Sequence, residues 1–308
     1  MRVLITGGAG FIGSHIVEHF QGQAEVRVLD NLRTGFRHNL KGFEYEFIQG
    51  SVLDRNLVRQ ATQGVDYVFH LAAMISVPES MEKPIECMEI NSIGTLVLLE
   101  EAARAGVKKL VLSSSAAIYG DNPITPKVET LRPEPKSPYA ISKLDGEFFC
   151  GMFAAEGRLQ TTCLRYFNVF GPRQDAKNPY AAAVPIFIEL ARKNEPIVIH
   201  GDGRQTRDFV FVKDVVAANV FFAMKSEASG VFNVAYGQGL AIHDLANSIC
   251  RLTGSRSALK HVAERPGDVK HSIAAIDKLR AAGFTMPNSI QPGLEATLSS
   301  AGWQLQSV

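Results

Sequence analysis

Tyr139 and Lys143 are the residues of this sequence whose types and spacing most directly suggest chemistry. They stand four residues apart, so a helix through 139–143 would place both side chains on one face. Pro138 is favoured at the first position of such a helix, and Ser137 is a suitable N-cap. An ammonium beside a phenol favours the phenolate and lowers its pKa, so this tyrosine is predicted to act as a general base near neutral pH.

An isolated pair with this spacing is more often an ordinary surface pair, so the rest of the chain must support the prediction. Residues 2–6 form a short apolar run that is typical of a strand and leads into Gly7-Gly8-Ala9-Gly10-Phe11-Ile12-Gly13 and a helical pattern. Strand, glycine turn and helix in this order indicate dinucleotide binding. Gly7 permits the tight turn, and Gly10 lets the backbone approach the pyrophosphate of the dinucleotide. Gly13 lets the helix pack closely on the strand. The free N–H groups of the helix then face the phosphates.

Asp30 ends a second predicted strand, 26–29, about 20 residues after the glycine loop. A carboxylate there accepts hydrogen bonds from the adenosine ribose and repels a 2′-phosphate, so NAD is predicted in preference to NADP. Arg33 is the one nearby feature that would favour NADP, and a simple loop cap is the alternative role for Asp30.

Strands and helices continue to alternate up to about residue 166. The apolar runs predict strands at 45–48, 65–70, 110–112 and 159–166, with helices at 54–61 and 89–105. This order indicates an α/β protein with a Rossmann-type, doubly wound parallel sheet, and ligands at the carboxyl ends of its strands. Ala72-Ala73 and Ser113-Ser114-Ser115 fall at such ends, whereas His70 is expected to be a packed or hydrogen-bonded histidine.

Beyond residue 167 the elements are shorter and interrupted by Gly and Pro, which predicts a smaller mixed α/β substrate lobe. The expected elements are helices at 181–192, 213–224, 242–252 and 276–282 and strands at 197–199 and 207–212. The dinucleotide-binding domain is expected to span 1–167 plus about 209–238, and the nucleotide-sugar-binding lobe about 168–208 and 239–308.

Composition narrows the classes of function. The chain has 308 residues with 32 basic and 31 acidic side chains, so no net charge favours nucleic acid or an anionic membrane as a partner. The four cysteines are scattered and have no metal-ligand spacing, which favours a reducing compartment and no metal site. Without a leader or a long apolar run, the protein is expected in the cytoplasm.

The combined motifs resemble the extended short-chain dehydrogenase/reductase family, and within it the NAD-dependent nucleotide-sugar 4-epimerases of the UDP-glucose and UDP-N-acetylglucosamine type. Besides the glycine loop, Asp30 and the Tyr139/Lys143 pair, the resemblance rests on Ser113-Ser114-Ser115-Ala116-Ala117-Ile118-Tyr119-Gly120, Arg165-Tyr166-Phe167-Asn168, Gly201-Asp202-Gly203, Arg207-Asp208-Phe209 and Arg265-Pro266-Gly267-Asp268. It covers nearly the whole chain.

The resemblance assigns a role to each matching position. It makes Tyr139 the acid/base, Ser115 the hydroxyl partner of the sugar oxygen and Lys143 the holder of the nicotinamide ribose. Residues expected to bind NAD are Gly7, Gly10, Phe11, Ile12, Gly13, Asp30, Asn31, Leu32, Ser51, Val52, Leu71, Ala72, Ala73, Ser113, Tyr139, Lys143 and Tyr166. Residues expected to bind a UDP-sugar are Ser115, Asn168, Ala183, Val184, His200, Arg207, Arg265, Asp268 and Ser272.

The chain departs from the family pattern at two places. Ser51 stands where an adenine-contacting aspartate is common, and Ala181-Ala182-Ala183 stands where asparagines often approach the sugar diphosphate. A 4,6-dehydratase or decarboxylase is the alternative enzyme, but a dehydratase normally carries an Asp-Glu pair where this chain has Ala116-Ala117, and methyl groups transfer no protons. A non-catalytic NAD-binding sensor is a further alternative, although such relatives usually lose the tyrosine or the lysine.

Two further expectations concern assembly and specificity. A homodimer is expected through the helix from about Glu89 and the helix that carries Tyr139, because apolar residues at 148, 149, 152 and 153 exceed one buried stripe; packing beneath the small lobe is the alternative. The family pattern places Ser272 against the C2 substituent of the sugar. A small residue there predicts activity on both plain and N-acetylated hexoses. The sequence does not determine which sugar is the physiological substrate, or whether its nucleotide is UDP or TDP.

Overall fold

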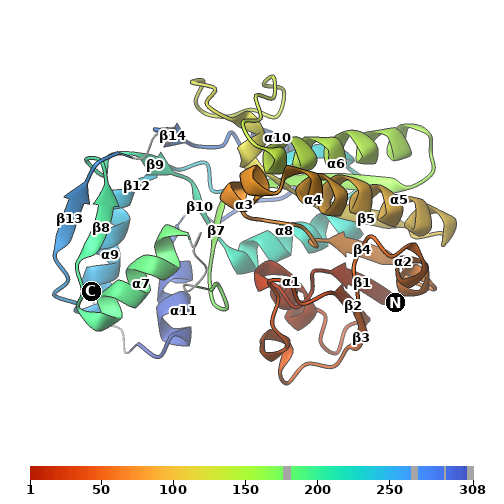
Figure 1. Cartoon of the computed structure of the whole chain (residues 1–308), viewed down its shortest axis with the longest axis horizontal. Coiled ribbons are helices and arrows are strands. Elements are labelled where there is room, and N and C mark those ends of the chain that lie inside the picture. Colours follow the sequence, from red (N-terminus) through yellow and green to blue (C-terminus); the bar gives the residue numbers. More distant parts are fainter. Residues whose placement is uncertain (176–181, 265–269, 288, 304–308) are drawn as a thin grey trace.

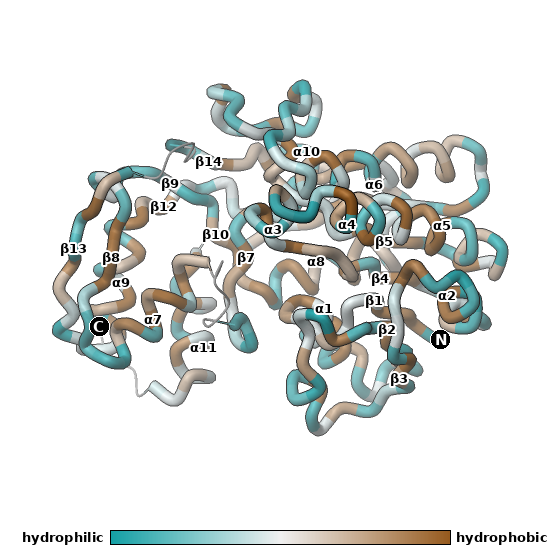
Figure 2. The backbone as a smooth tube through the Cα atoms, in the orientation of Figure 1, coloured by the Kyte–Doolittle hydropathy of each residue, from teal (hydrophilic) through white to brown (hydrophobic). Residues whose placement is uncertain are grey.

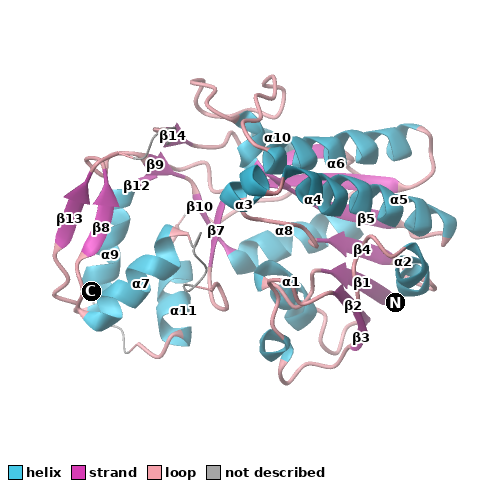
Figure 3. Cartoon of the chain, in the orientation of Figure 1, coloured by secondary structure: helices cyan, strands magenta, loops and turns pink. Residues whose placement is uncertain are grey.

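The computed structural model describes residues 1–175, 182–264, 270–287 and 289–303. It has two lobes, one built around a large sheet and a smaller one that contains α7, α9 and α11 (Figure 1). The fold predicted from the sequence is confirmed: the larger lobe is a Rossmann-type α/β layer structure and the smaller lobe mixes short strands with helices (Figure 3).

The large sheet has seven strands, all parallel, in the order β11-β6-β5-β4-β1-β2-β3. Its strands are β1 (Arg2–Thr6), β2 (Glu25–Asp30), β3 (Glu46–Gln49), β4 (Tyr67–His70), β5 (Lys109–Ser115), β6 (Gln160–Tyr166) and β11 (Gly230–Val234). Strand β11 at the sheet edge is not predicted from the sequence, because residues 230–234 follow no strong helical or alternating pattern.

Helices cover both faces of this sheet, which explains why its strands are apolar on both sides. Val3 and Ile5 point into the core beneath α1 (Phe11–His19) and α8 (Val212–Met224), whereas Leu4 points into the opposite core. That second core lies beneath α2 (Arg55–Thr62), α5 (Gly94–Arg104) and α6 (Pro138–Ala155). His70 is buried as expected, bonded through its two ring nitrogens to Thr6 and Thr95.

The helix expected at 89–105 is longer and less regular than predicted. It begins with α4 (Pro84–Met88), passes through a π-helical turn, η2 (Glu89–Ile93), and continues into α5. The separate helix α3 (Val77–Glu82) precedes it, and the non-helical residue Lys83 divides the two. Asn91 in this turn accepts a 2.7 Å bond from the Met74 N–H and donates to the Met74 carbonyl at 3.0 Å and to Ser142 at 2.9 Å. The turn therefore joins the loop after β4 to helix α6.

The smaller lobe is built from three helices and short sheets. Its helices are α7 (Ala183–Lys193), α9 (Ile242–Thr253) and α11 (Gln291–Ser300), and its strand pairings are β13-β8 and β12-β9-β14, with β10-β7 between the lobes. The bounds are β7 (Asn168–Phe170), β8 (Ile197–His200), β9 (Thr206–Arg207), β10 (Phe209–Phe211), β12 (Leu240–Ala241), β13 (Leu259–Val262) and β14 (His271–Ser272). The remaining elements are η1 (Arg37–Leu40), η3 (Ala116–Tyr119) and α10 (Asp277–Ala281).

The single strand expected at 207–212 is wrong, because Asp208 divides it into β9 and β10. The buried Asp208 carboxylate accepts backbone hydrogen bonds from Tyr236, Gly237 and Ala274, at 2.9, 2.9 and 3.2 Å. These long-range partners fix the break, and the next helix starts at Val212.

Within the described residues, no helix is long and apolar enough to cross a membrane.

Candidate active site

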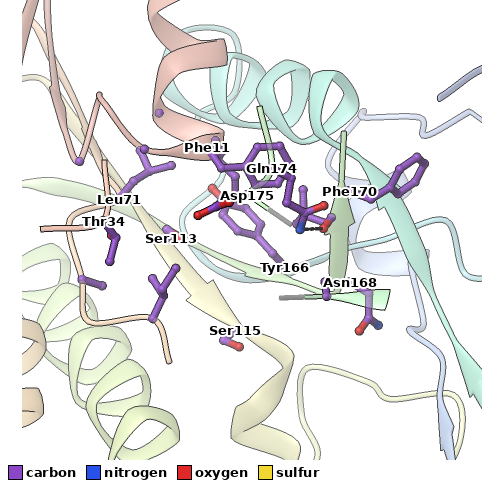
Figure 4. Close-up of a pocket in the computed structure, with 18 of the residues that line it drawn as sticks. Phe11, Thr34, Leu71, Ser113, Ser115, Tyr166, Asn168, Phe170, Gln174 and Asp175 are labelled. Carbon is purple, nitrogen blue, oxygen red and sulfur yellow. Dashed lines mark hydrogen bonds between the residues drawn. The ribbon is translucent and has the colours of Figure 1, made fainter. Parts of the chain in front are cut away.

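A cavity of about 760 Å³ opens at the carboxyl ends of the parallel strands and extends under the smaller lobe. Most residues predicted to bind ligands line it: Gly7, Gly10, Phe11, Ile12, Gly13, Asp30, Asn31, Ser51, Val52, Leu71, Ala72, Ala73, Ser113, Ser115, Tyr139, Lys143, Tyr166, Asn168, Ala183, Val184, His200 and Arg207. Figure 4 shows Ser113, Ser115 and Tyr166 on the sheet side of the cavity, with Leu71 and Thr34 to one side and Asn168 to the other.

Two predicted residues that the structure describes, Leu32 and Ser272, are not among those that line it. Leu32 has a positive φ of 60° and donates its N–H to Asp30, and its side chain packs against the hydrophobic core. Ser272 lies on β14, in register with Arg207 of the cavity wall. Arg265 and Asp268 lie outside the described residues.

The glycine loop is packed so closely that side chains are excluded. A Cβ on Gly13 would lie 2.2 Å from the Gly7 carbonyl oxygen, and one on Gly7, at φ +70°, would lie 2.7 Å from the Ala72 nitrogen. Helix α1 begins directly after Gly10 without any side-chain cap, so its first N–H groups stay available to a ligand.

Asp30 makes the contacts of a loop cap and also lines the cavity. Its carboxylate accepts from the Ala9 N–H at 2.9 Å and the Leu32 N–H at 2.7 Å, which fixes the glycine loop to the end of β2, and it also lines the cavity. Burial raises the pKa of this carboxyl, and the two backbone donors oppose that rise. Arg33 is held by Glu79 at 2.8 Å and by Glu86, so its charge is compensated at the place where a 2′-phosphate would need it.

The predicted N-terminus of α6 is confirmed. Pro138 is its first residue, and the Ser137 hydroxyl accepts a 3.2 Å hydrogen bond from the Ala140 N–H. This cap places Tyr139 in the first turn and Lys143 one turn later, both at the cavity. The Lys143 Nζ donates to the Ser113 carbonyl at 2.8 Å and lies 5.8 Å from the centre of the Tyr139 ring.

The expected lowering of the Tyr139 pKa is not seen in this structure. Burial raises the pKa of the Tyr139 phenol above its ordinary value, and interaction with the Ser115 hydroxyl only partly opposes that rise. Burial also lowers the pKa of Lys143 to about 8. Desolvation is the largest cause of both shifts, and the ammonium donates to a carbonyl of β5 and not to the phenol.

Ser115 is arranged to donate a hydrogen bond. Its Oγ accepts a 3.1 Å hydrogen bond from the Ala117 N–H at the start of η3, so its own O–H is left to donate toward the cavity. Ala116 and Ala117 follow immediately, and neither can transfer a proton.

The opposite part of the cavity suits an anion. Helix α7 begins at Ala183 without a side-chain cap, so its first N–H groups offer donors near Val184, and Arg207 adds a guanidinium. Asn168 is fixed by its Nδ2, which donates to the Asp208 carbonyl at 3.2 Å. His200 lies at the rim, with Nδ1 3.2 Å from the Ala263 carbonyl.

Several lining residues were missed from the sequence. The segment Thr34-Gly35-Phe36 closes over the glycine loop, where the Phe36 N–H donates to the Ala9 carbonyl at 2.9 Å. Gln174 reaches the cavity after β7, and its Nε2 donates to the Val169 carbonyl at 3.1 Å (Figure 4). Gly35 was the one local signal for the first of these segments; a loop residue such as Gln174 carries none.

Comparison with known proteins identifies the family. Residues 3–235 match the model of the NAD dependent epimerase/dehydratase family. The chain belongs to this family. The structure resembles the UDP-N-acetylglucosamine 4-epimerase of Methanobrevibacter ruminantium M1 in complex with UDP-N-acetylmuramic acid, with 39% identity, a TM-score of 0.94 and coverage of 97% of both chains.

Two other relatives frame the possible activities. The UDP-glucose 4-epimerase of Thermus thermophilus, in complex with NAD, shares 38% identity at a TM-score of 0.88, with 97% of this chain and 98% of that chain covered. A UDP-N-acetyl-alpha-D-glucosaminuronate decarboxylase of Bacillus cytotoxicus is 38% identical over 85% of this chain and 83% of its own length.

The cavity fits NAD on its own geometry. The tight glycine loop, the uncapped start of α1 and the Asp30 carboxylate provide the close backbone approach, the phosphate donors and the ribose acceptor that this dinucleotide requires. The protein is an NAD-dependent enzyme of the UDP-sugar 4-epimerase type.

Proposed function

We propose that this enzyme interconverts UDP-hexoses at C4, acting on UDP-glucose and UDP-galactose and on their N-acetyl counterparts. The observation that carries the proposal is the meeting of Tyr139, Lys143 and Ser115 in one cavity with an NAD-type glycine loop and the uncapped N-terminus of α7. An enzyme that oxidises a nucleotide sugar at C4 and re-reduces it in the same site needs an acid/base, a resident cofactor and a diphosphate anchor together.

Tyr139, as the phenolate, takes the proton of the C4 hydroxyl and later returns it, while the Ser115 hydroxyl donates a hydrogen bond to the same sugar oxygen. The positive nicotinamide of bound NAD and the Lys143 ammonium would favour this phenolate against the burial that raises the Tyr139 pKa. NAD, when bound, supplies the hydride acceptor for C4 and the hydride donor for the opposite face. Lys143 is anchored on Ser113, which keeps its ammonium at a fixed place for the nicotinamide ribose.

The diphosphate must stay bound while the 4-keto sugar turns over. The first N–H groups of α7 and the Arg207 guanidinium serve as that anchor, since both belong to the smaller lobe and not to the catalytic wall. Asn168, Ala183, Val184 and His200 complete this side, and Arg265 and Asp268 are assigned to it by the family pattern. The two lobes are accordingly 1–167 plus about 209–238 for NAD and about 168–208 with 239–308 for the nucleotide sugar.

The decarboxylase relative makes a second activity worth testing, because decarboxylation starts with the same oxidation at C4. Dehydration is less well supported, since Ala116 and Ala117 directly after Ser115 supply no acid or base for elimination. A non-catalytic sensor has no use for the retained Tyr139 and Lys143.

A homodimer is the proposed assembly. Phe148 and Met152 of α6 are 61% and 51% exposed, and α4 and η2 add Ile85 and Ile93, at 75% and 50%. Figure 2 shows the apolar stretches that recur along α4, α5 and α6. All four cysteines are free thiols, which agrees with the reducing cytoplasm as the expected compartment.

The test is incubation of the purified protein with UDP-glucose, UDP-N-acetylglucosamine and UDP-glucuronate, with separation of the products. We expect C4 epimers of the first two sugars. A pentose product from UDP-glucuronate without any C4 epimer would instead establish the decarboxylase.

A further inference from the structure

Helix α6 carries a third polar residue on the face that presents Tyr139 and Lys143. Glu147 stands one turn beyond Lys143, so the residues at 139, 143 and 147 form one stripe along the helix. Glu147 has no part in the mechanism above, and its side chain is only 4% exposed. A buried carboxylate on the catalytic face of a helix requires an explanation.

Its partners lie on two neighbouring strands, β5 and β6. The Glu147 carboxylate accepts two hydrogen bonds from Arg165 of β6, from Nε at 2.8 Å and from Nη2 at 2.7 Å, and a third from the Ser114 hydroxyl of β5 at 2.5 Å. Arg165 and Ser114 are register partners in the parallel sheet, so one carboxylate spans both strands. Arg165 is as buried as Glu147, with 4% of its side chain exposed.

Along β5, the residue that contacts Glu147 lies between two residues that contact the catalytic side chains. Ser113 accepts from Lys143, Ser114 donates to Glu147, and Ser115 acts on the phenol of Tyr139. Three consecutive residues of β5 are thus matched to three residues of one stripe on α6. The directional bonds of Glu147 fix both the rotation of α6 and its position along the strand.

We propose that Glu147, held by Arg165 and Ser114, is a positioning residue that sets the place of the Tyr139 hydroxyl relative to Ser115. The inference rests on the proposed function, in which these two hydroxyls share the C4 oxygen. Stability alone does not explain the pair, because a buried ion pair can often be replaced by apolar residues of similar volume without loss of stability. Apolar residues cannot reproduce its directional bonds.

The test compares kinetics with stability in the full-length enzyme with its bound NAD. Glu147→Gln keeps the shape but loses the charge, and Glu147→Met/Arg165→Met replaces the pair by an apolar one. We expect the double variant to fold and to keep its NAD and its KM, with a modest drop in unfolding temperature because Arg165 also contacts the Glu129 carbonyl and the Tyr119 ring. Its kcat should fall by about a hundredfold, the loss expected for a displacement of about 1 Å of a catalytic group.

The matched control is Glu101, a buried carboxylate on α5 that binds Arg59 and Arg55 at 3.0 Å each, away from the cavity. Glu101→Gln should lower the unfolding temperature and leave kcat unchanged. Ser114→Ala removes one hydrogen bond to Glu147 and disturbs packing little, and it should lower kcat as the Glu147 variants do. If the Glu147 variants fail to fold, the kcat of Ser114→Ala tests the positioning role by itself.

The outcomes separate the two proposals. An active wild type whose double variant and Ser114→Ala variant have the wild-type kcat overturns the positioning role and leaves the epimerase. A rise in KM at constant kcat overturns it as well, because it indicates a binding defect. A wild-type protein that forms no C4 epimer overturns the proposed function itself, and the positioning role with it.

Discussion

The Lys143 ammonium stands 5.8 Å from the centre of the Tyr139 ring and donates its hydrogen bond to the backbone of β5. Both groups are desolvated: the pKa of Tyr139 is raised, and that of Lys143 is lowered to about 8. Both shifts favour the neutral forms. Near neutral pH only Lys143 carries a cost in stability, because the phenol is neutral in the folded and the unfolded chain alike while the lysine is charged when unfolded.

The first prediction concerns that cost. The pKa of Lys143 is about 8 in the folded protein and 10.5 ordinarily, so the folded state disfavours its charged form. Lys143→Met should therefore raise the unfolding free energy at pH 7 by about 1–3 kcal/mol while epimerisation is lost. The gain should shrink as pH rises from about 8 to 10.5, because the folded wild type then sheds its proton before the unfolded chain does.

Denaturant unfolding at several pH values measures this difference. Lys109, at the opposite end of β5, is also buried with a lowered pKa, so Lys109→Met is the control that should keep full activity. A Lys143→Met protein that is less stable than wild type at pH 7 would show that the ammonium is not under strain.

A second prediction addresses cofactor choice. Asp30 repels a 2′-phosphate, and Glu79 and Glu86 compensate Arg33. The triple variant Asp30→Asn/Glu79→Gln/Glu86→Gln should lose at least about 1.4 kcal/mol of its preference for NAD, a tenfold change in the ratio of dissociation constants for NADP and NAD. Titration of cofactor-free protein with each dinucleotide gives that ratio. An unchanged ratio would mean that shape and not charge selects NAD.

A third prediction places the specificity gate at Ser272. Parallel pairing puts Ser272 on the same face of the small sheet as Arg207, which lines the cavity. Ser272→Tyr should abolish activity on UDP-N-acetylhexosamines and spare UDP-glucose, since overfilling a rigid site costs about 1–3 kcal/mol or more. His271→Tyr, on the opposite face of the same strand, is the control. Equal loss on both sugars would remove Ser272 as the gate.

A fourth prediction tests assembly. Phe148→Glu/Met152→Glu places two charges on the exposed apolar face of α6 and should convert the expected dimer to a monomer. Ile124→Glu, at a residue that is 54% exposed in the loop between η3 and α6, should leave the mass unchanged. Light scattering at micromolar concentration reads the outcome, and a monomeric wild type would contradict the dimer.

Features with a local cause were predictable from the sequence. β1, the glycine turn and the Ser137 cap were found because each depends on residues adjacent in the chain. The fold class followed from their repetition.

Features with a long-range cause were not predictable. Asp208 interrupts a strand because its carboxylate accepts hydrogen bonds from three backbone N–H groups that are distant in the sequence. The residues next to Asp208 in the sequence do not indicate these partners. The pKa of Tyr139 was mispredicted for the same reason: spacing shows that a lysine is near but not how completely both groups are desolvated. Four apolar residues of α6 were expected at the dimer face. The structure buries Phe153 in the core and exposes Phe148 at the surface, a difference that the sequence does not reveal.

The central claim is that Tyr139 catalyses reversible C4 epimerisation with NAD that stays on the enzyme. The most direct measurement is the rate and final ratio of C4 epimers, starting from UDP-glucose in one reaction and from UDP-galactose in another. Both reactions are run without added NAD, with the wild type and with Tyr139→Phe. The wild type should reach one product ratio from either sugar, and Tyr139→Phe should keep its bound NAD while losing about 10²–10⁴-fold in rate. The account is contradicted if Tyr139→Phe retains the wild-type rate, or if the wild type forms no C4 epimer from either sugar.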